Sequence, residues 1–152
     1  LTGTLWIAGN LTIQNSAIVR LDSSYGGLSG LILADDPANR ATKGVVSVKN
    51  SAQILGSGTP GSYVMVVSRN NSAEGGGGID AIDIQNTSTA SIYYAPHGSI
   101  SIKNSTTLKE VTAYKLKLEN SATVVYESGL QDVQFSAGPS GGYGIKYWKE
   151  VE

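Results

Sequence analysis

The chain has 152 residues and a formal net charge of −1, from 11 basic and 12 acidic side chains, and it contains no cysteine. This length fits one domain, and the balanced charge provides no field of one sign that would attract nucleic acid or an anionic membrane. The lack of cysteine excludes disulfides, thiol catalysis and thiolate metal sites, and no apolar run approaches the roughly 20 residues of a membrane-spanning helix.

The first predicted strand is Leu5-Trp6-Ile7, in a segment that opens at Leu1 without a methionine. We therefore expect the chain to be a piece of a longer or processed protein. An apolar strand with no cap before it exposes an edge to which another chain can pair. The expected partners are proteins or a second copy, bound through this N-terminal coil. A membrane link is expected only through a missing N-terminal segment, and no link to nucleic acid is expected.

Five segments share one pattern, in which an apolar-x-apolar-x strand is followed by asparagine and then by small residues. They end at Asn15, Asn50, Asn86, Asn104 and Asn120. A short repeat made of strand and turn is typical of a β-solenoid. The steps between the asparagines are 35, 36, 18 and 16 residues. Each long step is therefore predicted to contain one degenerate copy, at Leu31-Ile32-Leu33 and at Val64-Met65-Val66-Val67.

Side chains alternate between the two faces of a strand, so the apolar residues and the asparagine of each segment are predicted to face inward. Stacked asparagines can then form a ladder of amide hydrogen bonds. The residues between them form two outward polar columns, Thr12-Ser47-Asp83-Ser101-Lys117 and Gln14-Lys49-Gln85-Lys103-Glu119. The predicted fold is all-β, a single-stranded right-handed parallel β-helix (solenoid) of about eight short coils of about 16–18 residues, its handedness following the usual crossover rule.

The period is interrupted by two predicted loops, at residues 35–44 and 70–78. Val133-Gln134-Phe135 is predicted to be the last coil. After a turn at 138–142, residues 143–152 alternate aromatic and charged side chains, as expected of a capping strand that protects the end of a solenoid. The prediction is one β-helix domain over residues 1–152, with coils over 1–137 and a C-terminal cap over 138–152.

Acidic pairs were weighed as catalytic or calcium sites, because parallel β-helices often cleave acidic polysaccharides. Asp80 and Asp83 have no second carboxylate at the same position of a neighbouring predicted coil, and Asp35-Asp36 precedes a proline in a loop. The only histidine, His97, lies in a Pro-His-Gly turn without an assignable partner. We therefore predict no catalytic residue, no metal site and no cofactor, and we expect that the protein is not an enzyme.

Tyrosines are the stronger candidates for a contact surface: Tyr93, Tyr94, Tyr114 and Tyr126 fall in consecutive predicted coils. Exposed aromatic rings can stack on sugars or form an adhesive patch, which makes surface glycans candidate partners. Aromatic stacks also fill solenoid interiors, and strand alternation turns one of Tyr93 and Tyr94 inward. The structural interpretation is favoured.

Several of these stretches together resemble a known domain: the units around Asn104 and Asn120, the Tyr93-Tyr94-Ala95-Pro96 run, residues 126–130 and the ending 148–152. They are similar to the β-helical C-terminal domain of PilX-like pilus-assembly and surface proteins of uncultured, candidate-phylum bacteria. More distantly, the short coil resembles bactofilins, which polymerise end to end.

The resemblance implies a non-catalytic structural or interaction module of a pilus-like or cell-surface assembly, located outside the cell or at its envelope. Two alternatives stay open. One is a polysaccharide-binding or polysaccharide-cleaving β-helix, and the other is a scaffold that polymerises end to end like a bactofilin.

Overall fold

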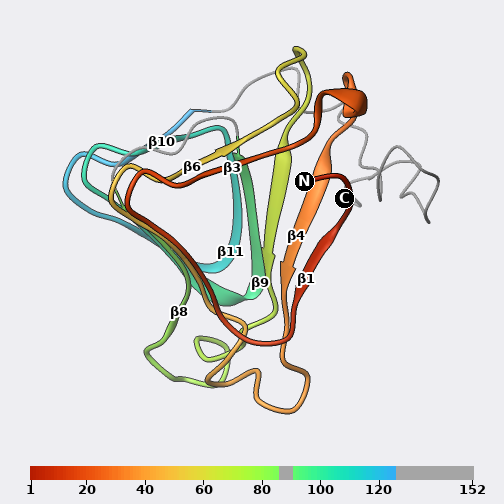
Figure 1. The fold of residues 1–152 in the computed structure, drawn as a ribbon. Coiled ribbons are helices and arrows are strands. Elements are labelled where there is room, and N and C mark those ends of the chain that lie inside the picture. Colours follow the sequence, from red (N-terminus) through yellow and green to blue (C-terminus); the bar gives the residue numbers. More distant parts are fainter. Residues whose placement is uncertain (86–90, 126–152) are drawn as a thin grey trace, which may run out of the picture.

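The computed structural model describes residues 1–85 and 91–125 of the chain. Within these ranges the protein is all-β, its strands pair only in parallel, and the one helical element is a single 3-10 turn at Ser23–Tyr25. The chain follows a triangular outline, and the strands lie along its three sides (Figure 1). None of the described segments is a helix of the length and apolarity that crossing a bilayer requires.

Two sides of the triangle belong to one continuous sheet with the strand order β1-β4-β7-β9-β8-β5-β2, in which β11 also pairs with β9. The first side contains β1 (Leu5–Ile7), β4 (Gly30–Ala34), β7 (Val64–Ser68) and the first part of β9 (Ser91–Lys103). The second side contains β2 (Leu11–Ile13), β5 (Val46–Val48), β8 (Asp80–Gln85) and the second part of β9. Strand β11 (Glu110–Leu118) follows β9 along both sides.

The third side contains two short pairs, β3 (Ile18–Arg20) with β6 (Gln53–Leu55) and β10 (Thr107–Leu108) with β12 (Thr123–Val124). Grouped in chain order, the strands form successive layers: β1–β3, β4–β6, β7–β8, β9–β10 and β11–β12. In Figure 1, β3, β6 and β10 lie along one side of the outline, and β1, β4 and β9 lie along another.

Strand pairing corrects the predicted number of coils. Ile13 pairs directly with Val48, Val48 with Ile84, Ile84 with Ile102 and Ile102 with Leu118. Each long step between asparagines therefore advances by one layer, and no degenerate copy lies between. The prediction of about eight coils of 16–18 residues is wrong, because residues 1–85 and 91–125 form five layers and two of their steps are about twice that long.

The supposed degenerate copies are strands of another side. Residues 31–33 lie in β4, a strand that pairs with both β1 and β7, and residues 64–67 lie in β7. The additional length of the long steps lies in the segments between the sides, at residues 21–29, which include the 3-10 turn, and at 35–45, 56–63 and 69–79. The predicted coil at Val133–Phe135 and the predicted cap at 138–152 lie outside the described residues.

Alternation along the strands fills the interior with β-branched side chains. On the second side, the inward residues of the three central strands are buried, and they include Val46, Val48, Ile82, Ile84, Ile100 and Ile102. The predicted register of the column Thr12-Ser47-Asp83-Ser101-Lys117 is confirmed, since these residues are direct partners in the sheet. Ser101 differs from the prediction because it is buried and does not face water. Burial of apolar area between the sides is the main source of stability in such a fold.

The asparagines are exposed at a corner rather than inward, which corrects the predicted inward ladder. Each described one has a left-handed backbone with φ between 53° and 58°, and the serine that follows has φ between 57° and 61°. Two successive left-handed residues make a type I′ turn, which asparagine tolerates well. The turn is closed by backbone hydrogen bonds such as Ala17 N–H to Gln14 O at 3.2 Å. The inward–outward alternation of side chains does not extend to the asparagine, because the strand has already ended.

The second turn position gives a test of this geometry. A left-handed backbone costs a non-glycine residue about 1–2 kcal/mol, and Asn-Gly is the preferred type I′ pair. We expect Ser51→Gly to raise the free energy of unfolding by about 0.5–1 kcal/mol, as measured by urea denaturation. The control is Ser47→Gly inside β5, where glycine should instead cost about 0.5–1 kcal/mol. A loss of stability in both variants would contradict the turn assignment.

Candidate functional site

The corner asparagines interact from layer to layer. Asn50 Nδ2 donates to Asn15 Oδ1 at 3.2 Å, and Asn120 Nδ2 donates to Asn104 Oδ1 at 3.1 Å. Asn86 lies outside the described residues. The side-chain amides therefore hydrogen-bond to one another along an exposed corner, and these bonds align the turns of neighbouring layers.

The tyrosines do not form one surface column. Tyr93 is fully buried, with Val66 and Val111 as its partners in register, so it belongs to the core and is removed from the candidate contact surface. Tyr94 is half-buried and pairs with Thr112 rather than with another aromatic residue. Tyr114 is exposed at the irregularity between Ala113 and Lys115. Tyr126 lies outside the described residues.

Asp80 and Asp83 are paired with lysines on the outer face of the second side. Lys117 Nζ lies 2.6 Å from Asp80 Oδ1, and Ser99 donates to the same oxygen. Burial raises the pKa of Asp80, but the hydrogen bonds from Lys117 and Ser99 and the nearby positive charge outweigh it, so this pKa lies below its usual value. Asp83 lies between Lys49 and Lys103, at 3.2 Å and 3.5 Å.

A general acid at neutral pH needs a carboxyl group with a raised pKa. The environment of Asp80 has the opposite effect, because it stabilises the ionised form. The outer face of the second side is therefore an ion-pair network that joins neighbouring layers.

The remaining sequence candidates also have local structural partners. Arg40 donates two hydrogen bonds of 2.8 Å to Asp35, and they hold the pKa of Asp35 below its usual value in spite of its burial. Asp36 accepts from Asn39 Nδ2 at 3.2 Å. His97 Nδ1 lies 2.7 Å from Glu74 Oε2 in an exposed contact. In the part of the chain that the structure describes, no group of three or more His, Asp or Glu residues is placed to hold a metal ion.

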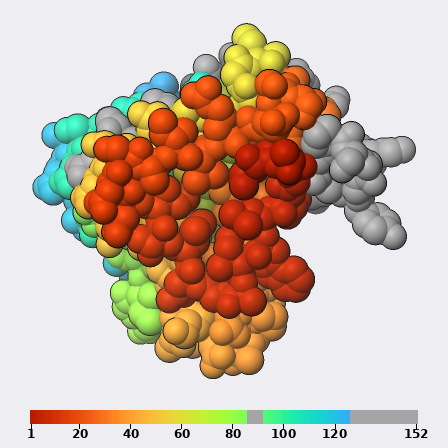
Figure 2. Space-filling view, in the orientation of Figure 1, coloured from red at the N-terminus to blue at the C-terminus, as the bar shows by residue number. Residues whose placement is uncertain are grey.

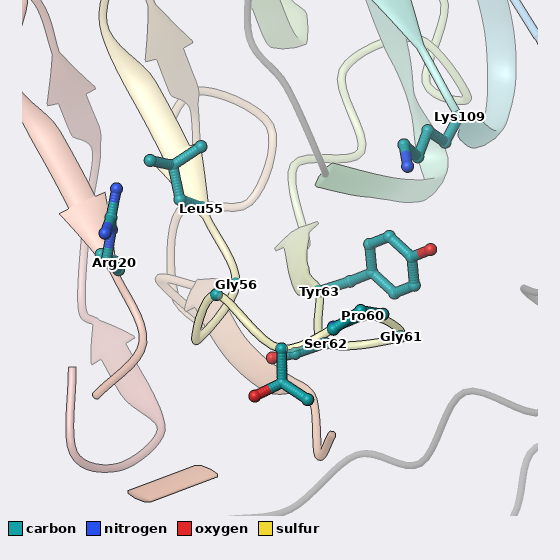
Figure 3. Close-up of a pocket in the computed structure, with 10 residues that line it drawn as sticks. Arg20, Leu55, Gly56, Pro60, Gly61, Ser62, Tyr63 and Lys109 are labelled. Atoms are coloured by element: carbon teal, nitrogen blue, oxygen red, sulfur yellow. The ribbon is translucent and has the colours of Figure 1, made fainter. Parts of the chain in front are cut away.

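A cleft of about 450 Å³ is a different kind of candidate, since its walls come from three separate segments (Figure 3). One wall is formed by the ends of β3 and β6, the floor by the loop that leads into β7, and the other wall by the residue between β10 and β11. The lining residues are Arg20, Leu55, Gly56, Gly58, Thr59, Pro60, Gly61, Ser62, Tyr63 and Lys109.

The cleft floor is braced by hydrogen bonds to the segment before β4. Ser62 Oγ donates to Leu28 O at 2.8 Å and accepts from Ser57 N–H at 3.0 Å, and Ser57 Oγ donates to Gly26 O. A Cβ at Gly56 would lie 2.0 Å from Ser62 O, so only glycine allows the two backbones to approach this closely. The floor is consequently held in one conformation before any ligand arrives.

Two of the residues that line the cleft are cationic. Arg20 and Lys109 lie on opposite sides of the floor loop in Figure 3, and the ten lining residues include no aspartate or glutamate. Lys109 Nζ lies 5.0 Å from the centroid of the Tyr63 ring, a cation–π contact that holds the ammonium group at the wall. We call Arg20, Lys109, Tyr63 and the floor loop 56–62 the cationic cleft.

Sequence reasoning missed the cationic cleft, because its two cations are isolated in the sequence and lie far apart. The only local signal is the run Gly56-Ser57-Gly58-Thr59-Pro60-Gly61, whose residue types favour a tight loop between two apolar strands. No family model, curated protein or solved structure matches this chain. The interpretation of the site therefore depends on its geometry.

Proposed function

We propose that this chain is a non-catalytic structural and interaction module of a cell-surface or pilus-like assembly, built as a single-stranded right-handed parallel β-helix. The observation that carries the proposal is the outer face of the second side, where the charged groups are used to join layers. Asp80 and Asp83 lie in β8, whereas their lysines lie in β9 (Lys103), in β11 (Lys117) and directly after β5 (Lys49). Charged groups that are paired between layers in this way support a rigid shape, and few polar groups on this face remain that could act in catalysis.

The β-helix is supported by the parallel pairing of each layer with the next and by the type I′ turn that returns at the same corner. The right-handed form follows the usual crossover between parallel strands. The extracellular or cell-envelope location follows the resemblance to surface and pilus-assembly proteins.

The first layer provides the interaction surface. Within residues 1–85 and 91–125, strands β1, β2 and β3 each pair with another strand on one edge only, and the second edge of β3 is contacted by Leu1, whose amino group donates to Arg20 O. A strand edge without a partner presents unpaired backbone groups. Trp6, in β1, is 65% exposed. In Figure 2 the N-terminal segments form the near face of the molecule. We propose that a second copy of the chain pairs with this edge.

Self-association tests the proposal. We expect the average mass measured by light scattering to rise with protein concentration, and Trp6→Lys to suppress the rise because it places a charge on the edge strand. Ile79→Lys is the matched control, since Ile79 is a 38% exposed apolar residue in a loop away from β1. A chain that stays monomeric at millimolar concentration, or equal suppression by both variants, would rule out pairing through the first layer.

The two alternative functions, the bactofilin-like scaffold and the glycan-binding or glycan-cleaving β-helix, predict different properties of this protein. A bactofilin-like scaffold would form open filaments in the light-scattering experiment instead of closed small oligomers. A polysaccharide-cleaving enzyme would need convergent groups with perturbed pKa values in a groove, whereas Asp80 and Asp83 are neutralised by lysines.

A further inference from the structure

The outer face of the first side is apolar, unlike the polar outer face of the second side. Strand alternation sends Ile32 and Val66 into the core and the residues beside them outward. The register aligns the outward side chains in two rows, Trp6-Leu33-Val67-Tyr94 and Leu31-Met65-Ile92. Trp6 is exposed, Ile92 is buried, and the other five are half-buried. We call these seven residues the apolar face.

The size of the apolar face limits what can cover it. Four strands at a spacing of about 4.8 Å and a length of up to about 16 Å give an area of about 300 Å². A stable complex of separate proteins buries about 800 Å² on each partner and must offset the loss of translational freedom. A segment of the same chain avoids most of that loss, because its attachment keeps it at an effective concentration of about millimolar. The area therefore favours an occupant from this chain over a second copy.

The chain supplies such a segment after its last described strand. Val125 N–H donates to Leu108 O, and β11 begins on the first side at Glu110, so residue 125 lies at the corner between the third side and the first. Another 27 residues follow, and the last ten combine apolar and aromatic side chains with charges: Tyr143, Ile145, Tyr147, Trp148 and Val151 among Lys146, Lys149, Glu150 and Glu152. The 17 residues between, 126–142, can reach about 56 Å when extended, which exceeds the dimensions of the apolar face.

A buried donor lies at the end of the apolar face that borders the second side. Residue 69 directly follows β7 and continues the outward alternation of Met65 and Val67. Arg40 donates two hydrogen bonds to Asp35, and the nearby charge of Arg69 also lowers the pKa of this carboxyl group. Among the described residues, Arg69 Nε is buried without a hydrogen-bond partner. A carboxylate at the end of the occupant would satisfy this donor.

We propose that residues 143–152 pack across the apolar face, with Tyr143, Ile145 and Tyr147 against its two rows and a terminal glutamate close to Arg69. This position is beside the layers and not over their end, where the sequence predicts a cap. Docking covers the apolar face and confines contacts with other copies to the edge of the first layer. Trp6 takes part in both surfaces, so the variants below are placed in β7, and docking and self-association can fail independently.

The first test uses Met65, which is the single methionine of the chain and belongs to the apolar face. The full 152-residue chain is prepared with photo-methionine at this position, freed of the leader that carries the start methionine, and irradiated at several dilutions. We expect mass spectrometry to find cross-links from position 65 to residues 143–152 of the same molecule, with a yield that does not change on dilution. Cross-links that form only between copies, or none to residues 143–152, would overturn the proposal.

The second test measures how fast trypsin cleaves the full chain after Lys146. We expect Val67→Gln to accelerate this cleavage at least about fivefold, because cleavage needs the undocked segment and the variant removes apolar area from the centre of the face. Ser47→Gln, on the outer face of the second side, is the matched control and should stay within about twofold. Thermal melts verify that the variants fold.

Val124→Gln, in the last described layer, distinguishes docking on the apolar face from a cap over the end. We expect it to leave the cleavage rate within about twofold. An acceleration by Val124→Gln as large as that by Val67→Gln would place the segment over the last layer. That result, or an unchanged rate in folded Val67→Gln, would overturn the proposal.

Discussion

Gly98→Ala is expected to destabilise the protein by about 3 kcal/mol, the upper part of the range for overpacking a filled interior. Gly98 is buried in the bend of β9 where the first side meets the second. A Cβ there would lie 2.2 Å from the Cβ of Ala81 and 2.8 Å from Asn70 O. Neither group can rotate away, since one is a buried methyl group and the other is backbone. The substitution must therefore displace a strand.

The matched control is Gly78→Ala, at a glycine whose Cβ would meet nothing within 4 Å and whose backbone is not left-handed. We expect it to be neutral or to stabilise by about 0.5 kcal/mol, through the reduced freedom of the unfolded chain. Chemical denaturation of the two variants measures the difference. Similar midpoints for both would show that the corner at Gly98 is looser than the close packing described above.

Ile102→Ala is expected to cost about 3–4 kcal/mol, because it removes a fully buried side chain and leaves a cavity between the sides of the triangle. Its partner in register, Leu118, is 50% exposed in the last described layer. We expect Leu118→Ala to cost less than half as much, about 1–1.5 kcal/mol, because water already reaches half of this side chain. Urea denaturation with a common slope measures both values.

The comparison of Ile102→Ala with Leu118→Ala also tests how exposed the last described layer is. An equal cost at Ile102 and Leu118 would contradict the exposure of Leu118 and would mean that this side chain is buried in solution. A small cost at both would contradict the closed interior instead.

Much of the strand arrangement could be predicted from residue patterns. The Ile-x-Ile alternation identifies the inward residues of β8 and β9, and with it the column that includes Asp83 and Ser101. These predictions succeed because alternation is a local property of a strand. The orientation of Asn104 could not be obtained in the same way, since its left-handed backbone ends the alternation.

Layer spacing and the cationic cleft depend on contacts that the local sequence does not specify. The step from Asn15 to Asn50 is close to two short repeats, but the pairing of Ile13 with Val48 makes it one layer with longer connections. Arg20 and Lys109 face one cleft because the third side brings distant segments together. Neither the layer spacing nor the shared cleft can be recognised from the residue types at these positions.

The connections from the first side to the second cross one corner of the triangle, and their lengths differ widely from layer to layer. In the second and third layers they contain residues 35–45 and 69–79, whereas β9 and β11 cross without leaving the strand. The two longer connections contact each other, since Asn71 N–H donates to Arg40 O, and the connection of the third layer also contacts β9, since Glu74 N–H donates to His97 O. Because the entropy of closing a loop grows slowly with its length, this corner can absorb insertions while the paired strands keep their register. It is consequently the place where new peptide segments could be grafted, and where sequence drift could diversify the surface without redesign of the interior.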